Sequence, residues 1–437
     1  MPDSDDTGSG SPFLPFSNSP FRDKGILPPS PLLDFPLSGP LFPFSRPAVA
    51  PTRARRDNVR VLTYATAGES HGPGLFATVT GLPYGAPVDL DFVNAELLRR
   101  QGGYGRGPRM KMEEDRAEIV SGVRHGKTLG SPVTLRIPNR VANSEELPPI
   151  TRPRPGHADL AGALKFGTAD ARDVAERSSA RETAARVAAG ALVHGFLQIF
   201  GIRAAGYVVE LGGTPSGGRA ASAAEAISAR AASDFASLDA KVDASWRALV
   251  DHAREAGDTL GGVFEVCAWG LPPGIGSHAG WELKLDGSLA RALMSVQTVK
   301  GVEVGLGFEA ARRRGSQVHD EVSAGLVRTG NNAGGIEGGM TNGQPLVARA
   351  ACKPLSTLRK PLRTVDLSTG KEEAAAFERS DVCVVPAASV IGEAVVAFEL
   401  GRAFLDKFGG DTFEETRSRV EAYLDKVARM ARPAGPA

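Results

Sequence analysis

The sequence predicts an α+β protein with one large globular domain, and three observations support this. The chain has 437 residues, which is long enough to bury a sizeable core. Apolar residues make up 42% of it and charged residues 23%, as is ordinary for a soluble globular protein. Strand-like and helix-like segments are intermixed without the regular alternation of a βαβ repeat. We therefore divide the chain into an extension at 1–58, a globular domain at 59–430 and a tail at 431–437.

The extension differs from the rest of the chain in composition. Residues 1–58 are rich in Pro, Ser, Gly and Phe and have no helical or alternating period, which predicts disorder. A plastid transit peptide is the alternative, because Arg53-Ala54-Arg55-Arg56 closes the segment. The acidic residues Asp3, Asp5 and Asp6 argue against it, since transit peptides contain few acids. A gene start placed too far upstream is a third explanation.

The globular domain contains several segments with clear periodicity. Alternating or short apolar runs predict strands at 59–64, 75–80, 261–271 and 302–308. Apolar residues at helical spacing predict helices at 89–100, 179–200, 388–408 and 413–428. The Ala- and Ser-rich segment 213–258 is also expected to be helical. The sequence shows neither a dinucleotide-binding fingerprint after a strand nor a Walker loop or an internal repeat.

The bulk properties exclude several classes of partner. The formal net charge is only +1, which argues against a surface that binds nucleic acid. The three cysteines, Cys267, Cys352 and Cys383, lie far apart and offer no zinc spacing or disulfide framework, which suits a reducing compartment. No apolar run approaches the ~18 residues of a membrane span. We therefore expect a cytoplasmic protein without a bound metal, with the plastid as the alternative location.

Two histidines stand in glycine-flanked turns, where a ligand can approach the backbone closely. One is in Gly68-Glu69-Ser70-His71-Gly72, directly after a predicted strand, and the other is in Arg154-Pro155-Gly156-His157-Ala158-Asp159. Histidine is the side chain best suited to proton transfer near neutral pH. Each motif taken alone is also compatible with a surface turn or a rigid linker.

Arginines gather in a glycine-rich segment that follows the first predicted helix. The segment Arg99–Lys111 contains five cations and four glycines. Arginine matches phosphate and carboxylate geometry, and glycine lets the backbone approach an anion. An RNA-binding loop is the alternative, but such loops usually occur in long repeats, and this segment is single. A small anionic ligand is therefore favoured.

Three further segments complete the candidate site. Ser179 and Glu182 predict a capping box that opens the long helix at 179–200, and a helix N-terminus is also a ready anion site. The segment Thr329–Gly343 has six glycines in fifteen residues, which favours backbone packed against a planar or phosphate-bearing ligand. Arg379 and Asp381 are two residues apart, so in an extended chain they share one face. An ion-paired strand edge is the structural alternative for that pair.

Taken in order, these motifs resemble those of the chorismate synthase family closely, from about Arg60 to Lys426. The motifs that carry the resemblance are Gly68–Gly72, Arg99–Gly107, Ser121–Gly126, Arg154–Asp159, Arg177–Thr183, Gly305–Glu309, Gly315-Ser316, Gly338–Gly343 and Arg379–Asp381. The resemblance implies a single-domain β-α-β sandwich and a homotetramer. It also implies reduced FMN as cofactor and 5-enolpyruvylshikimate 3-phosphate as substrate. The expected reaction is an anti 1,4-elimination of phosphate that forms chorismate without net redox change.

The resemblance also implies roles for individual residues. His71 would act as an acid near the substrate phosphate, His157 would steady the charge of the reduced flavin, and Asp381 would help flavin N5 accept the C6 proton. The implied substrate ligands are Arg100, Arg109, Arg154, Arg181 and Arg379. The implied FMN ligands are Arg106, Ser178, Ser179, Ala180, Asn331, Gly338, Lys353 and Thr357. Ser380 stands where many members of the family have His.

The source of reduced flavin is a separate question. The chain has no large internal insertion of the kind associated with members that reduce their own flavin. This predicts a monofunctional enzyme that depends on an external flavin reductase or another NADPH-dependent supply of reduced FMN. A flavoprotein that carries out ordinary hydride transfer is the alternative, but it would need a site for its reductant.

Overall fold

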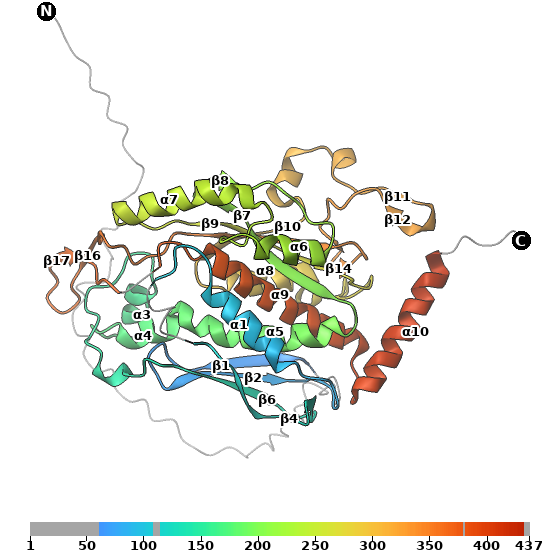
Figure 1. Ribbon diagram of the computed structural model, residues 1–437, viewed down its shortest axis with the longest axis horizontal. Helices are drawn as coiled ribbons and strands as arrows, with labels where there is room; N and C mark the ends of the chain where they lie inside the picture. Colours follow the sequence, from blue (N-terminus) through green and yellow to red (C-terminus); the bar gives the residue numbers. More distant parts are fainter. Residues whose placement is uncertain (1–60, 108–113, 379–380, 432–437) are drawn as a thin grey trace, which may run out of the picture. The chain divides into compact units, whose positions relative to one another are not determined.

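The computed structural model describes residues 61–107, 114–378 and 381–431. Two antiparallel sheets enclose a layer of long helices, which is the expected β-α-β sandwich (Figure 1). The four-stranded sheet has the order β1 (Thr63–Ala67), β2 (Gly74–Thr80), β6 (Val133–Pro138), β3 (Glu118–Ser121). The five-stranded sheet has the order β10 (Val299–Val304), β15 (Leu346–Cys352), β9 (Gly262–Trp269), β7 (Arg203–Leu211), β8 (Thr214–Pro215). The prediction for residues 1–58 lies outside the described residues.

Three helices form the middle layer: α1 (Leu90–Gln101), α5 (Thr183–Gln198) and α9 (Val385–Phe408). Helix α5 packs on β2 and β6, and α9 packs on β7 and β9. Helix α9 is rich in Val, Ala and Ile and is buried on nearly all sides, as expected for a helix between two sheets. A Cβ at Gly190 of α5 would lie 2.2 Å from the carbonyl oxygen of Ala394, so glycine allows the two helices to cross closely.

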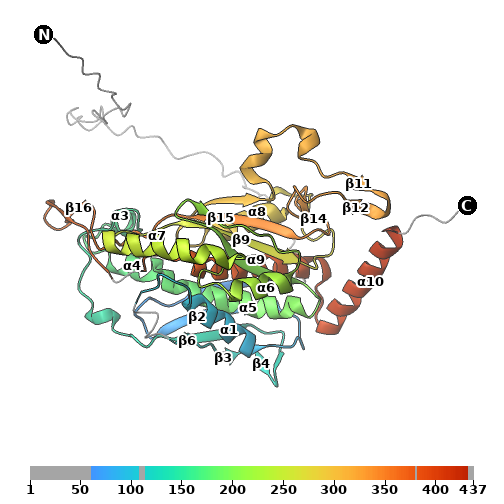
Figure 2. The same cartoon turned by 45° about the horizontal axis from the view of Figure 1, so that its top comes forward.

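Helix α8 (Leu285–Met294) packs on α9 and on β10 of the five-stranded sheet. The other helices of the described residues lie outside the middle layer (Figures 1 and 2). They are α3 (Asp159–Phe166), α4 (Arg172–Ser178), α6 (Ala223–Ala231), α7 (Asp243–Ala256) and α10 (Phe413–Ala431). The described residues also form four two-stranded antiparallel ribbons. These pair β4 (Val123–Arg124) with β5 (Lys127–Thr128), β11 (Val322–Ser323) with β12 (Val327–Arg328), β13 (Ile336–Glu337) with β14 (Met340–Thr341), and β16 (Arg363–Val365) with β17 (Glu372–Ala374). No helix in the described part of the chain is long and apolar enough to cross a membrane.

Most predicted elements are confirmed, and the errors have physical causes. The strand expected at 59–64 is found at Thr63–Ala67, where it pairs with Phe76–Thr80, so the partner strand decides its bounds. The strand expected at 302–308 ends at Val304, because Gly305 and Gly307 adopt φ of 59° and 56° and turn the chain. The segment 213–258 is not one helical stretch, since α6 and α7 are separate helices.

Candidate active site

The turn that carries His71 begins where β1 ends. Gly68 adopts φ of 104°, and a Cβ there would lie 2.2 Å from the carbonyl oxygen of Gly74. Only glycine fits this close return of the chain. Ser70 is buried, and its backbone N–H donates to the carbonyl oxygen of Glu176 at 3.2 Å. The turn is therefore held against helix α4.

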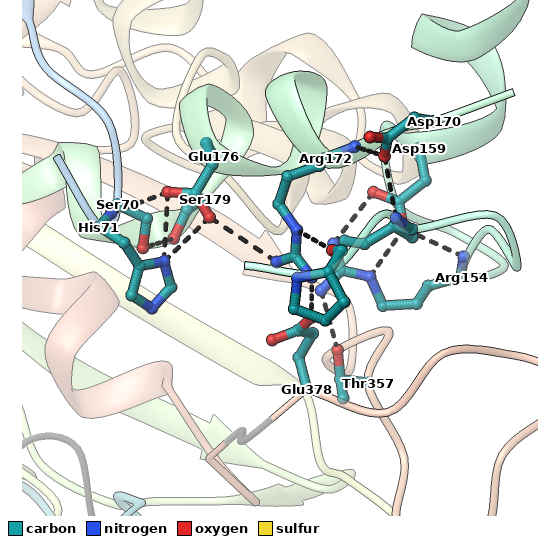
Figure 3. Close-up of polar contacts among 12 residues, drawn as sticks. Ser70, His71, Arg154, Asp159, Asp170, Arg172, Glu176, Ser179, Thr357 and Glu378 are labelled. Carbon is teal, nitrogen blue, oxygen red and sulfur yellow. Dashed lines mark hydrogen bonds and ion pairs between the residues drawn. The ribbon is translucent and has the colours of Figure 1, made fainter. Parts of the chain in front are cut away.

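Glu176 holds His71 by two contacts. One carboxylate oxygen accepts the backbone N–H of His71 at 2.7 Å, and the other lies 2.9 Å from His71 Nδ1. Burial alone would raise the pKa of Glu176, but its contacts with His71 and Arg172 outweigh this and lower the pKa. A carboxylate at Nδ1 orients the ring and leaves Nε2 for a ligand. Figure 3 shows this pair, with Ser179 beside Ser70.

Asn139 fixes the same turn from its other side. Its amide nitrogen donates to the carbonyl oxygens of Glu69, Ser70 and Gly72 at 2.8–3.3 Å. Its amide oxygen accepts from Arg181 Nε at 2.9 Å. One buried side chain thus joins the histidine turn to an arginine of the candidate substrate set.

The start of the long helix differs from the capping box that the sequence predicts. A short 3₁₀ turn, Ala180–Glu182, precedes α5, and Ser179 accepts the backbone N–H of Arg181 at 3.2 Å. Glu182 does not complete the box, because its carboxylate bonds to Thr66 at 2.6 Å and to Arg186. The prediction is wrong for Glu182, because tertiary partners in β1 and the next turn of the helix engage its side chain.

Two arginines of the candidate substrate set share one buried carboxylate. Arg100 and Arg181 both form ion pairs with Asp115, through its Oδ2 and Oδ1 respectively. Arg100 also donates to Thr183 and to the carbonyl oxygen of Ala180, at 3.0 and 2.9 Å. Burial lowers the pKa of Arg100 to about 10. The two cations therefore lie side by side at the entrance to α5, with one negative charge between them.

The second histidine belongs to a compact ionic cluster. Asp159 is fully buried and accepts from Arg154 Nε at 2.7 Å and from Arg154 Nη2 at 3.0 Å. His157 Nδ1 contacts the same carboxylate and lies 3.1 Å from Arg154 Nη2. Burial opposes ionisation of Asp159, yet His157 and Arg154 hold its pKa well below the usual range. The right side of Figure 3 shows Arg154, Asp159 and the nearby Thr357.

Lys353 lies beside this second cluster. The position that a Cβ would take at Gly156 is 3.9 Å from Lys353 Nζ. Burial, with a contribution from Lys300, lowers the pKa of Lys353. A cavity of about 590 Å³ opens next to Arg154 and His157, and its wall includes Leu160, Leu164 and Leu367. Such a cavity, apolar with a few charged groups, suits an organic anion.

The third predicted catalytic residue, Asp381, is paired with Arg106. Arg106 Nη1 lies 2.5 Å from Asp381 Oδ2, and the backbone N–H of Gly107 donates to Oδ1 at 2.6 Å. Asp381 stands four residues before α9 and Arg106 five residues after α1, so the segments that adjoin two helices of the middle layer supply this pair. Arg109 and Arg379, two predicted substrate ligands, lie outside the described residues.

Arg172 connects the His71 centre, through Glu176, to the segment that leads to Asp381. Its guanidinium lies 3.8 Å from Glu176 and donates to Glu378 at 3.1 Å, while Nε donates to the carbonyl oxygen of Pro148 (Figure 3). The backbone N–H of Arg172 donates to Asp170. The structure therefore brings together motifs that are more than 200 residues apart in the sequence.

The glycine-rich segment has its own structural explanation. Gly338 and Gly339 form the turn of the β13–β14 hairpin, with φ of 59° and 86°, as a two-residue type I′ turn requires. Asn331 bonds to Pro345 and Gly335 within the same loop. Between described residues, no hydrogen bond or ion pair joins Asn331 or Gly338 to either histidine centre. Their assignment to the FMN site stays a prediction.

The segment before β10 contains a buried polar atom without a partner. Within the described chain, Gln297 Oε1 has no hydrogen-bond partner, while the amide nitrogen of Gln297 donates to Glu182 at 3.3 Å beside the start of α5. Thr298 adopts φ of 82°, which is strained for a β-branched residue, and its carbonyl oxygen accepts the backbone N–H of Lys353. Ser178 Oγ, at the end of α4, is also buried without a partner in the described chain. A free amide oxygen can accept a hydrogen bond from a polar ligand, and a free hydroxyl can accept or donate one.

No group of three or more His, Cys, Asp or Glu side chains in the described residues is arranged to hold a metal ion.

The comparisons with known proteins agree with the motifs. The family model for chorismate synthase matches residues 62–405. The chain belongs to the chorismate synthase family. Its function is therefore the synthesis of chorismate, in the shikimate pathway.

Individual relatives match over nearly their whole length. Chorismate synthase of Geobacter sulfurreducens is 52% identical over 390 residues, which are 84% of this chain and 99% of the relative. That of Symbiobacterium thermophilum is 54% identical and is matched over 100% of its length. A crystal structure of chorismate synthase superposes with a TM-score of 0.71 at 41% identity, and covers 85% of this chain.

Several residues of the site were not predicted individually from the sequence. They are Asp115, Asn139, Asp159, Arg172, Glu176, Gln297, Thr298 and Glu378. Asp159 and Glu176 stand inside motifs that the sequence shows, so their proximity to a histidine or an arginine was an available signal. Asp115 and Asn139 stand alone in the sequence, and only the fold brings them to the arginines.

Proposed function

We propose that the protein eliminates phosphate from 5-enolpyruvylshikimate 3-phosphate with reduced FMN as cofactor and without net redox change. The observation that carries this proposal is the pair of carboxylate-held histidines, His71 and His157, among arginines Arg100, Arg154 and Arg181. The substrate carries a phosphate and two carboxylates, so a site for it needs several cations. Reduced FMN, when bound, supplies an electron to the departing system and recovers it.

His71 is proposed to protonate the leaving phosphate. The carboxylate of Glu176, 2.9 Å from Nδ1, fixes the direction of the ring. The proton would then pass from Nε2 to a phosphate oxygen. The contact between Glu176 and the backbone N–H of His71 limits movement of the ring, which supports an acid held in one orientation.

His157 is proposed to balance charge on the flavin side of the site. Its Nδ1 contacts both Asp159 and Arg154, so its ring is oriented by groups of opposite charge. Lys353 and Thr357 adjoin the same cluster, which supports placing both on the flavin side. Arg106, Ser178, Ser179, Ala180, Asn331 and Gly338 complete the proposed FMN set.

Asp381 is proposed to take part in removal of the C6 proton. Arg106 and the backbone N–H of Gly107 hold its two carboxylate oxygens, which keeps the side chain in one position. Arg106 would also neutralise the carboxylate until substrate is in place. Arg100, Arg109, Arg154, Arg181 and Arg379 form the proposed substrate set.

Assembly and supply of the cofactor are further parts of the proposal. We infer a cytoplasmic homotetramer that takes reduced FMN from an external flavin reductase or another NADPH-dependent source. The relatives that match over 98–100% of their length support the absence of an added reductase segment between the motifs. Residues 1–58 lie before the family match at 62–405 and leave the plastid alternative open.

The decisive experiment is anaerobic turnover. Folded protein is mixed with chemically reduced FMN and 5-enolpyruvylshikimate 3-phosphate, and phosphate and chorismate are measured together. Equal amounts of both products are expected, with no stoichiometric consumption of flavin. Absence of turnover by flavin-bound protein would contradict the proposal. A second assay uses oxidised FMN and NADPH: activity without an added reductase would show that the protein reduces its own flavin.

A further inference from the structure

Another ionic cluster, which we call the Glu393 cluster, lies in the helical middle layer, apart from the two histidine centres. Its centre is Glu393 of α9, whose exposed fraction is 1%. One oxygen of Glu393, Oε2, accepts from Arg99 Nη2 and Arg230 Nη1, both at 2.6 Å, and from the backbone N–H of Gly206 at 2.8 Å. Three donors from α1, α6 and β7 therefore converge on one carboxylate oxygen.

The charges in this cluster balance. Arg99 also holds Glu96 of α1, which gives two arginines and two carboxylates. His194 of α5 lies 3.7 Å from Glu393, and its Nε2 accepts the backbone N–H of Ala204. Because Nε2 is an acceptor and burial lowers its pKa to about 4, His194 is neutral at pH 7. No net charge is left uncompensated in the interior.

Close packing of α9 on β7 makes these contacts geometrically feasible. A Cβ at Gly206 would lie 2.2 Å from the carbonyl oxygen of Ser389, and a Cβ at Gly392 would lie 2.2 Å from the ring of Phe264. Helix and sheet can approach this closely only with glycine at both places. Glu393 consequently reaches the backbone of the sheet directly.

The Glu393 cluster joins α1 to α9, and the segments next to these two helices contain the Arg106–Asp381 pair of the candidate active site. Arg99 points to Glu393, while the next residue of α1, Arg100, points to Asp115. Five residues after α1 ends, Arg106 forms its ion pair with Asp381, which stands four residues before α9 begins. The separation of α1 and α9 thus decides where Arg100, Arg106 and Asp381 meet.

The loop between these residues has little freedom to absorb a shift of α1. A Cβ at Gly103 would lie 2.8 Å from Pro386 of α9, and the carbonyl oxygen of Gly105 accepts the backbone N–H of Val382 at 2.8 Å. Movement of α1 relative to α9 would therefore be transmitted to Arg106 rather than taken up by the loop.

We propose that Arg99 and Glu393 position the active site by locking α1 to α9, and that this ion pair sets the placement of Arg100 and of the Arg106–Asp381 pair. The inference rests on the proposed function. Arg99 and Glu393 are positioning residues, since among the described residues the side chain of neither contacts one assigned to substrate or flavin. Loss of the pair would weaken substrate binding and turnover at a temperature where the protein is still folded.

Arg230 provides a matched control. It donates to the same oxygen of Glu393 at the same distance of 2.6 Å, but it comes from α6, outside the middle layer. Removing either arginine leaves Glu393 with one cation, and removing Arg99 also leaves the buried Glu96 without its partner, so both changes should reduce thermal stability, Arg99→Met by more. Only removal of Arg99 breaks the ion pair between α1 and α9.

The test compares Arg99→Met with Arg230→Met in three measurements: Tm, the Kd for substrate in the presence of oxidised FMN, and anaerobic turnover. We expect a decrease in Tm for both variants, larger for Arg99→Met, and the activity of each is measured at a temperature where both are folded. We expect about a 10-fold loss of kcat/KM and a rise of about 5-fold in Kd for Arg99→Met, against changes within about 2-fold for Arg230→Met, since small misplacements of binding groups cost rate steeply. Arg99→Lys, which keeps the cation, should recover most of the loss.

Equal losses of activity in the two Met variants would overturn the proposal, as would full activity of Arg99→Met. If Arg99→Met is not recovered folded, Arg99→Gln is compared with Arg230→Gln, and the same inequality in Kd and kcat/KM is required. If the wild-type protein binds substrate but forms no chorismate, the proposed function fails, and the comparison of Kd values still decides the positioning role.

Discussion

The two histidine centres use the same contact but obtain it in different ways. His71 Nδ1 contacts Glu176, 105 residues further along the chain, whereas His157 Nδ1 contacts Asp159, only two residues away. The first pairing depends on packing of α4 against the turn after β1. The second is built into one short segment and is reinforced by Arg154, whose guanidinium shares the carboxylate of Asp159.

Because of this difference, we expect the two carboxylates to have different main roles. Glu176 contacts both His71 and Arg172, and at His71 its role is to hold the ring in one orientation. Asp159 is fully buried and neutralises a buried arginine as well as contacting a histidine. We therefore expect changes at Glu176 to affect mainly the reaction rate, and changes at Asp159 to affect mainly folding.

The largest expected effect is on turnover when either histidine is removed. His71→Ala and His157→Ala should each reduce kcat by at least ~10²-fold, the usual scale for a positioned acid or base. His252→Ala is the control, because His252 is exposed on α7 and belongs to none of the motifs of the site. Near-normal activity of either site variant would remove that histidine from the proposed mechanism.

Glu176→Gln should have the next largest effect. The amide keeps the shape of the side chain but is a weaker hydrogen-bond acceptor than the carboxylate, so the ring of His71 is less firmly oriented and kcat should fall by about 10-fold, as for other residues that orient a histidine. The KM for substrate should change by less than about 2-fold, because Glu176 is not one of the proposed substrate ligands. An unchanged kcat would show that Glu176 does not act through His71. The melting temperature serves as the control for folding.

Asp159→Asn should instead show its main effect in stability. It leaves Arg154 buried without its partner, and the free energy of unfolding should fall by about 3 kcal/mol at pH 7. Because the folded-state pKa of Asp159 is depressed, its contribution is present above the unfolded value near ~3.9 and is lost as the pH falls below it. The variant should therefore lose less stability than wild type between about pH 5 and pH 2.

Thermal unfolding across this pH range measures the effect of Asp159→Asn. Asp91→Asn is the matched control, since Asp91 is exposed in the first turn of α1. A variant curve parallel to that of wild type would mean that Asp159 is not the carboxylate responsible for acid sensitivity.

The smallest effect is expected from deletion of residues 1–56, which precede the family match at 62–405. Their sequence has no core periodicity, so kcat and Tm should be unchanged within error. A truncated protein that is insoluble or inactive would show that this segment takes part in folding or catalysis.

The sequence alone determined the family and the long helices, and it holds the local centre at His157 within one short segment. Periodicity identified α1, α5, α9 and α10 because each has a continuous apolar face or is apolar throughout. The contact of His157 with Asp159 spans two residues, so the geometry of one turn is enough to bring them together.

Only the tertiary structure decided the partners that come from distant segments. Glu176 at His71, Asn139 at the turn, and Asp115 between Arg100 and Arg181 depend on how α4, α5 and the four-stranded sheet pack. Glu393 in the sequence of α9 looks like a polar interruption of an apolar helix, and its role appears only where α1, α6 and β7 converge on it. A buried charge must be paired, but periodicity cannot say with what, because the partner is chosen by packing and not by distance along the chain.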